Sequence, residues 1–69
     1  MKNKFAQRVK ELRIEYKLNQ AKFAELCKVK QSCVSKWERA ETLPDIETLI
    51  TIAELLNVST YYLLGVKDY

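Results

Sequence analysis

The side chains that most often do chemistry in small proteins are scarce in this sequence. It contains no histidine, so the usual general base and the commonest metal ligand are both missing. The two cysteines, Cys27 and Cys33, are too few to complete a zinc site and too few and too close to build a disulfide framework. We therefore expect reduced thiols, no metal, no cofactor and no catalytic activity.

Basic residues are concentrated in the first part of the chain. Residues 1 to 39 hold eleven Lys or Arg against four Glu, a net charge of +7, whereas residues 40 to 69 hold one Lys against five acidic residues, a net charge of −4. A surface divided in this way can turn its basic side toward a polyanion such as a nucleic acid. Basic helical surfaces also serve solubility, so an ordinary solvated face remains the alternative.

Length and turn content favour one small helical domain. A chain of 69 residues has room for a single core, which we expect to span residues 1 to 69. One Gly and one Pro are too few for the tight turns of a small β-sandwich or barrel, so the expected fold is all-α. The sequence has no run of apolar residues of membrane-spanning length and no secretory signal at its start, which predicts a cytoplasmic protein without membrane contact.

Apolar spacing predicts the first two helices. The buried stripe of a helix over residues 4 to 16 is marked at steps of three and four by Phe5, Val9, Leu12 and Tyr16. The residues expected to face water on this helix are Lys4, Arg8, Lys10, Glu11 and Glu15. Asn19 is suited to cap a short second helix over about residues 20 to 27, whose inner face is Phe23, Ala24 and Cys27.

A third helix, over about residues 31 to 39, is expected to direct Val34 and Trp37 inward and polar side chains outward. The linker before it, Lys28-Val29-Lys30, has the length that joins two helices at a steep angle in a helix-turn-helix. The polar outer side of this helix is therefore the first place to look for a binding surface.

The remaining pattern predicts two more helices. After a loop that contains Pro44, Asp45 is suited to cap a fourth helix. The expected inner stripe of that helix is Ile46, Leu49, Ile50, Ala53 and Leu56. Ser59 then caps a last helical turn, and Gly65 ends it.

Residues 18 to 38, LNQAKFAELCKVKQSCVSKWE, resemble the helix-turn-helix of the lambdoid phage repressor and Cro family, which includes the Xre-like bacterial regulators. The matching positions within the motif are Leu18, Gln20, Phe23, Ala24, Val29, Val34, Trp37 and Glu38. The match continues beyond the motif at Pro44, Ala53, Leu56, Val58 and Leu63. The resemblance covers nearly the whole chain and implies a compact five-helix bundle with its helix-turn-helix over about residues 20 to 39.

The same resemblance implies a sequence-specific regulator that binds double-stranded DNA. In this family the third helix enters the major groove, and the positions that read base edges match Gln31, Ser32 and Lys36. The candidates for phosphate contact are Gln20, which matches a family glutamine, and the flanking basic residues Lys28, Lys30 and Arg39. Polar residues on a short helix are otherwise usually just solvated, which is the alternative at each position.

Three further features come from the family pattern. Arg13 and Glu38 match a pair that joins the first helix to the end of the third, and we expect a structural role because no second carboxylate or histidine is spaced for catalysis. Lys28 stands where glycine is usual, so it is expected to adopt a positive φ, and Ala40 replaces a second usual glycine. Lys30 replaces the usual Ser or Thr N-cap, so the third helix is expected to begin without a side-chain cap.

The C-terminal segment, residues 59 to 69, has more apolar surface than a short helix buries. The candidates for a dimer interface about a two-fold axis are Tyr61, Leu64 and Val66. A tail that folds back over the first helix is the alternative. A homodimer would place two recognition helices one turn of DNA apart, which predicts a palindromic operator.

The expected function is thus a homodimeric transcriptional repressor. An antitoxin or a restriction-modification controller of the same fold is one alternative, because no residue of this sequence separates these roles. A protein-interaction module that binds no DNA is another, and the basic residues around the third helix argue against it.

Overall fold

The computed structural model describes residues 4–68, so residues 1–3 and 69, the two ends of the expected domain, lie outside the described part. In chain order the helices are α1 (Phe5–Glu15), α2 (Gln20–Cys27), α3 (Gln31–Glu38), α4 (Ile46–Leu56) and α5 (Thr60–Leu64). Residues 4–68 contain no strand, and the predicted all-α, five-helix fold is confirmed.

Side-chain caps define where three of the helices begin. Asn19 accepts a hydrogen bond from the backbone N–H of Lys22 at 2.7 Å, which caps α2. Asp45 caps α4 and Ser59 caps α5 through equivalent bonds to the third residue beyond each of them. Gly65 ends α5 at a φ of 80°, and a Cβ there would lie 2.9 Å from the Cβ of Lys4, so this position requires glycine for two reasons.

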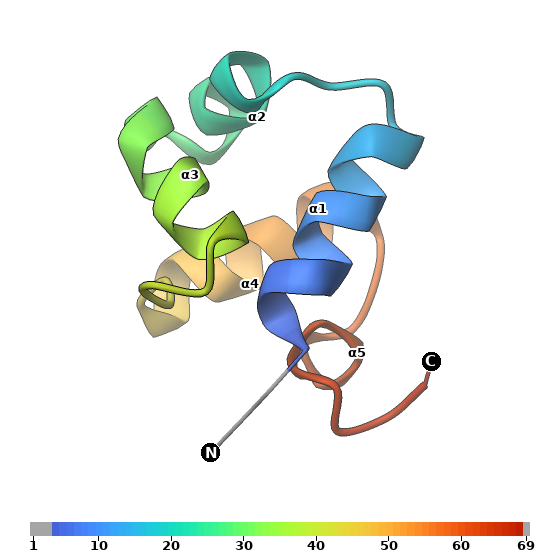
Figure 1. The fold of residues 1–69 in the computed structure, drawn as a ribbon. Coiled ribbons are helices and arrows are strands. Elements are labelled where there is room, and N and C mark those ends of the chain that lie inside the picture. Colours follow the sequence, from blue (N-terminus) through green and yellow to red (C-terminus); the bar gives the residue numbers. More distant parts are fainter. Residues whose placement is uncertain (1–3, 69) are drawn as a thin grey trace.

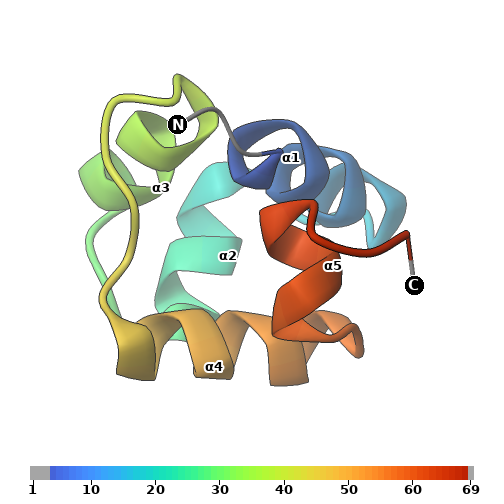
Figure 2. The same ribbon diagram turned by 90° about the horizontal axis from the view of Figure 1, so that it is seen from below.

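The helices enclose one core, and each contributes to it. Figure 1 shows α2 and α3 as one corner of the molecule, with α1 crossing beside them. In the view of Figure 2, α4 lies across one side, and α2 and α5 stand against it. The fully buried side chains are Phe5, Val9, Phe23, Val34, Ile52, Leu56 and Leu63. Burial of each such side chain stabilises the fold by about 1.5–3 kcal/mol, which makes this core the main source of its stability.

Arg8 was expected to face water, and this expectation is wrong. Its Nη1 donates hydrogen bonds to the carbonyl oxygens of Tyr62 at 2.5 Å and Lys67 at 2.8 Å. Its guanidinium carbon also lies 4.2 Å from the centre of the Tyr62 ring, and its Nη2 forms an ion pair with Asp68 at 3.1 Å. Helix α5 and the segment that follows it thus offer carbonyls and an aromatic face that take up a buried cation.

Three apolar residues expected inside are instead exposed. Ile46 and Ile50 are 76% and 46% exposed, because α4 turns Ile52 into the core in their place. Seven of the eleven residues of α4 are apolar, so two overlapping stripes fit the helical period and spacing alone cannot choose between them. Tyr16 lies at the edge of the core, where its hydroxyl donates to the carbonyl oxygen of Leu56 at 2.8 Å.

Candidate nucleic-acid interface

Helix α3 presents a polar stripe opposite its packed side. Val34 and Trp37 are buried, and the rings of Trp37 and of Phe5 in α1 meet edge to face with ring centres 6.3 Å apart. The helical period places the outward stripe at Ser32, Ser35, Lys36 and Arg39. Gln31, at the first turn, is exposed together with Ser32 and Lys36. The three predicted base readers are therefore all open to solvent on one short helix.

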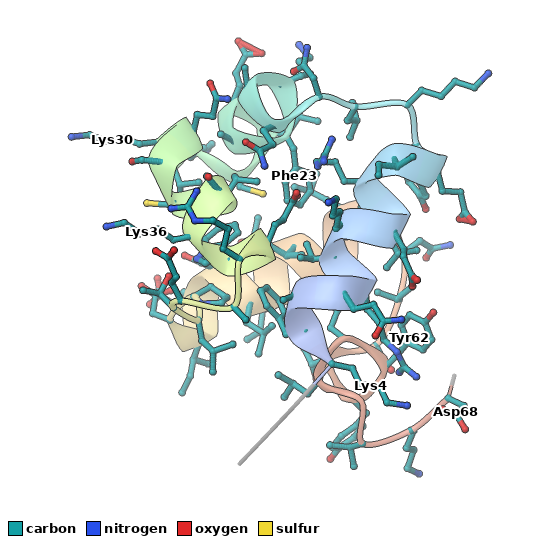
Figure 3. The ribbon with its side chains drawn as sticks, in the orientation of Figure 1. Lys4, Phe23, Lys30, Lys36, Tyr62 and Asp68 are labelled. Atoms are coloured by element: carbon teal, nitrogen blue, oxygen red, sulfur yellow. The ribbon has the colours of Figure 1, made fainter. Side chains whose placement is uncertain are left out.

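Two lysines extend from this part of the molecule into solvent. Lys30 and Lys36 both point away from the body of the protein on the same side of α3, whereas Phe23 lies in the interior (Figure 3). Lys28, in the turn between α2 and α3, is exposed as well. These three ammonium groups, with no carboxylate bonded to any of them among the described residues, give the outer side of α3 a positive potential.

The turn between α2 and α3 has the geometry expected from its departures from the family pattern. Lys28 ends α2 at a φ of 62° and a ψ of 40°, the left-handed conformation that glycine adopts more easily. Ala40 also has a φ of 62°. Lys30 stands at the N-cap of α3 without a side-chain hydrogen bond. Val29, between the two lysines, packs against the core and holds the turn in place.

A buried ion pair fixes α3 relative to α1. The Nε and Nη2 atoms of Arg13 donate to the two carboxylate oxygens of Glu38 at 2.6 Å and 3.1 Å. The Nη1 atom of Arg13 donates to the carbonyl oxygen of Leu18 at 2.7 Å. The side chains of Arg13 and Glu38 are only 11% and 4% exposed. Both charges are thus withdrawn from water and satisfied by each other and by the backbone.

Gln20 joins the same network, which the sequence pattern did not indicate. Its Nε2 donates to Glu38 at 3.1 Å, so the start of α2 is tied to the end of α3. A glutamine amide has two N–H donors, and one of them remains for a phosphate. Whether Gln20 bonds phosphate stays a prediction.

Arg39, the fourth candidate for phosphate contact, already has an anionic partner. Its Nε and Nη2 donate to the two carboxylate oxygens of Glu41 at 2.7 Å and 3.3 Å, and its Nη1 donates to the hydroxyl of Ser35. The hydrogen bond with Arg39 lowers the pKa of Glu41, as do the charges of Arg39 and Lys36, and the same hydrogen bond raises the pKa of Arg39. The sequence signal for this pair is the carboxylate two residues further along the chain.

The two thiols lie in different surroundings. Cys27 is buried in the core, and loss of solvation raises the pKa of its thiol to about 11. Cys33 is half-buried on α3. Within residues 4–68 no cluster of three His, Cys, Asp or Glu side chains is arranged to hold a metal ion. None of the helices described combines the length and the apolar character needed to cross a bilayer.

The predicted dimer candidates differ in exposure. Tyr61 and Val66 are 58% and 66% exposed, whereas Leu64 is half-buried and packs against the core. The segment after α5 returns to α1 through the bonds of Arg8 to Lys67 and Asp68. It therefore folds back over α1 and still leaves two apolar side chains open.

Comparisons with known proteins agree with this geometry. A family model described as helix-turn-helix matches residues 9–63. The chain is 34% identical over 58 residues to the repressor protein C2 of Salmonella phage P22, an alignment that covers 84% of this chain and 27% of that protein. It is 41% identical over 61 residues to the HTH-type transcriptional regulator ImmR of Bacillus subtilis, covering 88% of this chain and 47% of that one. The chain thus spans less than half the length of either relative.

Solved structures show the same likeness. The structure of the P22 c2 repressor in complex with a synthetic operator superposes with a TM-score of 0.86 at 32% identity, over 91% of this chain and 96% of that chain. The restriction-modification controller protein C.AhdI from Aeromonas hydrophila superposes with a TM-score of 0.78 at 30% identity, over 87% and 91%. The chain belongs to the helix-turn-helix family of the lambdoid phage repressors, the Cro proteins and the Xre-like regulators, in agreement with the resemblance of residues 18 to 38.

Proposed function

We propose that this chain is the DNA-binding part of a sequence-specific transcriptional regulator and works by binding, not by catalysis. The observation that carries the proposal is the outward side of α3, where Gln31, Ser32 and Lys36 are exposed opposite the buried Val34 and Trp37. An α-helix with such a side fits the major groove of B-DNA. The similarity to a repressor solved on an operator supports the same function.

The chemistry of these side chains suits base recognition. The amide of Gln31 can bond the N6 and N7 atoms of adenine, and the ammonium of Lys36 can bond the O6 and N7 atoms of guanine. The hydroxyl of Ser32 can serve either base. Each well-formed base contact discriminates against the wrong base by about 1–3 kcal/mol.

Phosphate contacts would supply most of the affinity. Arg8 and Arg13 are buried, so the exposed lysines around α3, Lys28, Lys30 and Lys36, carry the positive surface charge there. Gln20 and Arg39 complete the predicted phosphate set. Each phosphate neutralised releases counterions, so the logarithm of the binding constant should fall by about 0.9 per contact for each decade of salt.

The dimer belongs to the same proposal. Tyr61 and Val66 are exposed on the C-terminal segment, and Leu64 lies between them along the chain. We expect the two copies to meet there and to place their α3 helices about 34 Å apart, one turn of DNA. The operator would then be a palindrome. Cellular placement in the cytoplasm follows from the same function.

Selection of bound duplexes from a random pool tests the proposal directly. We expect enriched duplexes with two inverted half-sites whose centres lie about ten base pairs apart. Enrichment of a single half-site would overturn the dimer and keep the DNA-binding function. Absence of salt-sensitive binding to any duplex would overturn the DNA-binding function and favour a protein-interaction module.

A restriction-modification controller is a second candidate of the same binding class. The superposition on C.AhdI favours it. Controller, antitoxin and repressor share the DNA-binding chemistry, and the genes next to the selected operator would separate them.

A further inference from the structure

Glu41 places a carboxylate on the side of α3 that is proposed to face DNA. The backbone N–H of Arg39 still donates to the carbonyl oxygen of Ser35 at 3.0 Å, so the helical spacing continues to Arg39. Ser35 and Arg39 therefore share the outward stripe with Ser32 and Lys36. The backbone N–H of Glu41 donates to the carbonyl oxygen of Lys36 at 2.9 Å, which holds Glu41 against the end of this stripe.

The contact between Arg39 and Glu41 resembles the contact that a phosphate would make. The carboxylate meets the Nε and Nη2 edge of the guanidinium with both oxygens, at 2.7 Å and 3.3 Å. Arginine binds carboxylate and phosphate through the same planar fork of donors. Both side chains are about half exposed, at 55% and 50%, so an anion from outside can reach the pair.

We propose that Glu41 is an intramolecular competitor for DNA phosphate, which occupies Arg39 in the free protein and is displaced when DNA binds. The proposal rests on the proposed DNA-binding function. The ion pair must break before Arg39 can neutralise a phosphate, and the cost of breaking it reduces the free energy of binding. Glu41 thus lowers the affinity for every duplex by the same factor and leaves sequence preference unchanged, because phosphate contacts carry no sequence information.

The strength of the pair sets the size of the effect. Exposed ion pairs of this kind change an equilibrium by a factor of about two to five, so phosphate can displace the carboxylate at a modest cost. Glu41 therefore adjusts the affinity and does not block binding.

A double-mutant cycle tests the competition. Four proteins are compared: the unmodified chain, Glu41→Gln, Arg39→Gln and the double variant. Their affinities for the selected operator and for a random duplex are measured over a range of salt concentrations. Glu47→Gln is the matched control, because Glu47 is another exposed carboxylate and lies in the first turn of α4.

We expect Glu41→Gln to raise the affinity about two- to fivefold on both duplexes. It should change the slope of log K against log salt by less than about 0.9, the value for one whole phosphate contact, because Arg39 contacts phosphate in both complexes. When Arg39 is already replaced by Gln, the added substitution Glu41→Gln should raise the affinity for DNA no more than the control Glu47→Gln does. Thermal melting followed by circular dichroism checks that all variants remain folded.

Two results would overturn the competition while DNA binding stands. An equal gain with and without Arg39 would mean that Glu41 acts only through its charge. A loss of affinity in Glu41→Gln would mean that the carboxylate positions Arg39 for DNA and does not compete with it. If the unmodified chain binds no duplex at all, the proposed function fails first, and the competition fails with it.

Discussion

The molecule has a helix-turn-helix part, α2 and α3, and a C-terminal part, α4, α5 and the segment after them. Helix α1 contacts each part through a buried arginine, and the two arginines have different partners. Arg13 holds α3 through Glu38, a carboxylate whose side chain is 4% exposed. Arg8 holds the end of α5 mainly through neutral carbonyl oxygens, and its one charged partner, Asp68, is 92% exposed. The helix-turn-helix part thus depends on an ion pair withdrawn from water, whereas the C-terminal part depends on carbonyls and apolar packing.

This difference predicts which of the two arginine contacts loses more stability when one residue is substituted. Removal of one member of a buried ion pair leaves an unpaired charge in the interior. Removal of Arg8 leaves only carbonyls that have lost a donor. We infer that loss of the arginine contact that positions α3, the helix with the proposed binding side, destabilises the protein more than loss of the arginine contact that positions α5.

The largest effect is expected for Arg13→Met, which would leave the Glu38 carboxylate buried with Gln20 as its remaining partner. We expect the free energy of unfolding to fall by about 3–5 kcal/mol. Chemical denaturation measures the change, and Lys10→Met, an exposed position on the same helix, is the control. A loss below about 1 kcal/mol, the range of exposed ion pairs, would show that the two arginines are not as different as the geometry indicates.

The next effect concerns the packing of α4 in the C-terminal part. Ile52→Ala should lower the free energy of unfolding by about 2–5 kcal/mol because Ile52 is fully buried. Ile50→Ala, two residues earlier on the same helix, should change it by less than about 0.5 kcal/mol. Denaturation of both variants measures the contrast. Equal losses of unfolding free energy in the two variants would mean that Ile50 packs in the core, as apolar spacing alone predicts.

A smaller effect is expected for Arg8→Met. The carbonyls of Tyr62 and Lys67 lose a donor, which should lower the free energy of unfolding by about 1–3 kcal/mol. The backbone amides of α5 should exchange hydrogen faster than in the unmodified chain, and this increase should be larger in α5 than in α3. Asp68→Asn serves as the control and should change little, since Asp68 is almost fully exposed. A loss as large as that of Arg13→Met would remove the distinction between the two parts.

The smallest effect is expected at two residues whose backbone is left-handed, with a positive φ, one in each part of the molecule. Lys28 ends α2 at a φ of 62°, and Asn57 ends α4 at a φ of 56°. Lys28→Gly should raise the free energy of unfolding by up to about 1 kcal/mol, because lysine is strained in this conformation. Asn57→Gly should gain less, since asparagine tolerates it. Thermal unfolding of the pair measures the difference, and a larger gain at Asn57 would contradict it.

Most of the local structure could be predicted because its causes lie close together in the sequence. The bounds of α2 were correct, as were the caps at Asn19, Asp45 and Ser59, since each cap acts on a residue three positions away. The positive φ of Lys28 followed from the family resemblance, which places a glycine at this position. These features need no knowledge of tertiary contacts.

The features that were missed depend on partners far along the chain or on a choice between equal patterns. Arg8 bonds residues 54 and 59 positions away, so its burial has no local signal. The exposure of Ile46 and Ile50 depends on which of two apolar stripes meets the core. At the candidate site the exposed positions of α3 followed from helical spacing, whereas the bond of Gln20 to Glu38, 18 residues away, required the fold.

The central claim is that the outward side of α3 reads bases, and a panel of operators tests it most directly. Affinities of the unmodified chain and of Gln31→Ala are measured on the selected operator and on its single base-pair variants, with Lys30→Ala as the phosphate control. We predict that Gln31→Ala loses about 1–3 kcal/mol of preference at one base pair of each half-site and keeps the others, while Lys30→Ala weakens all duplexes equally. Preferences that remain unchanged in Gln31→Ala at every base pair would contradict the claim.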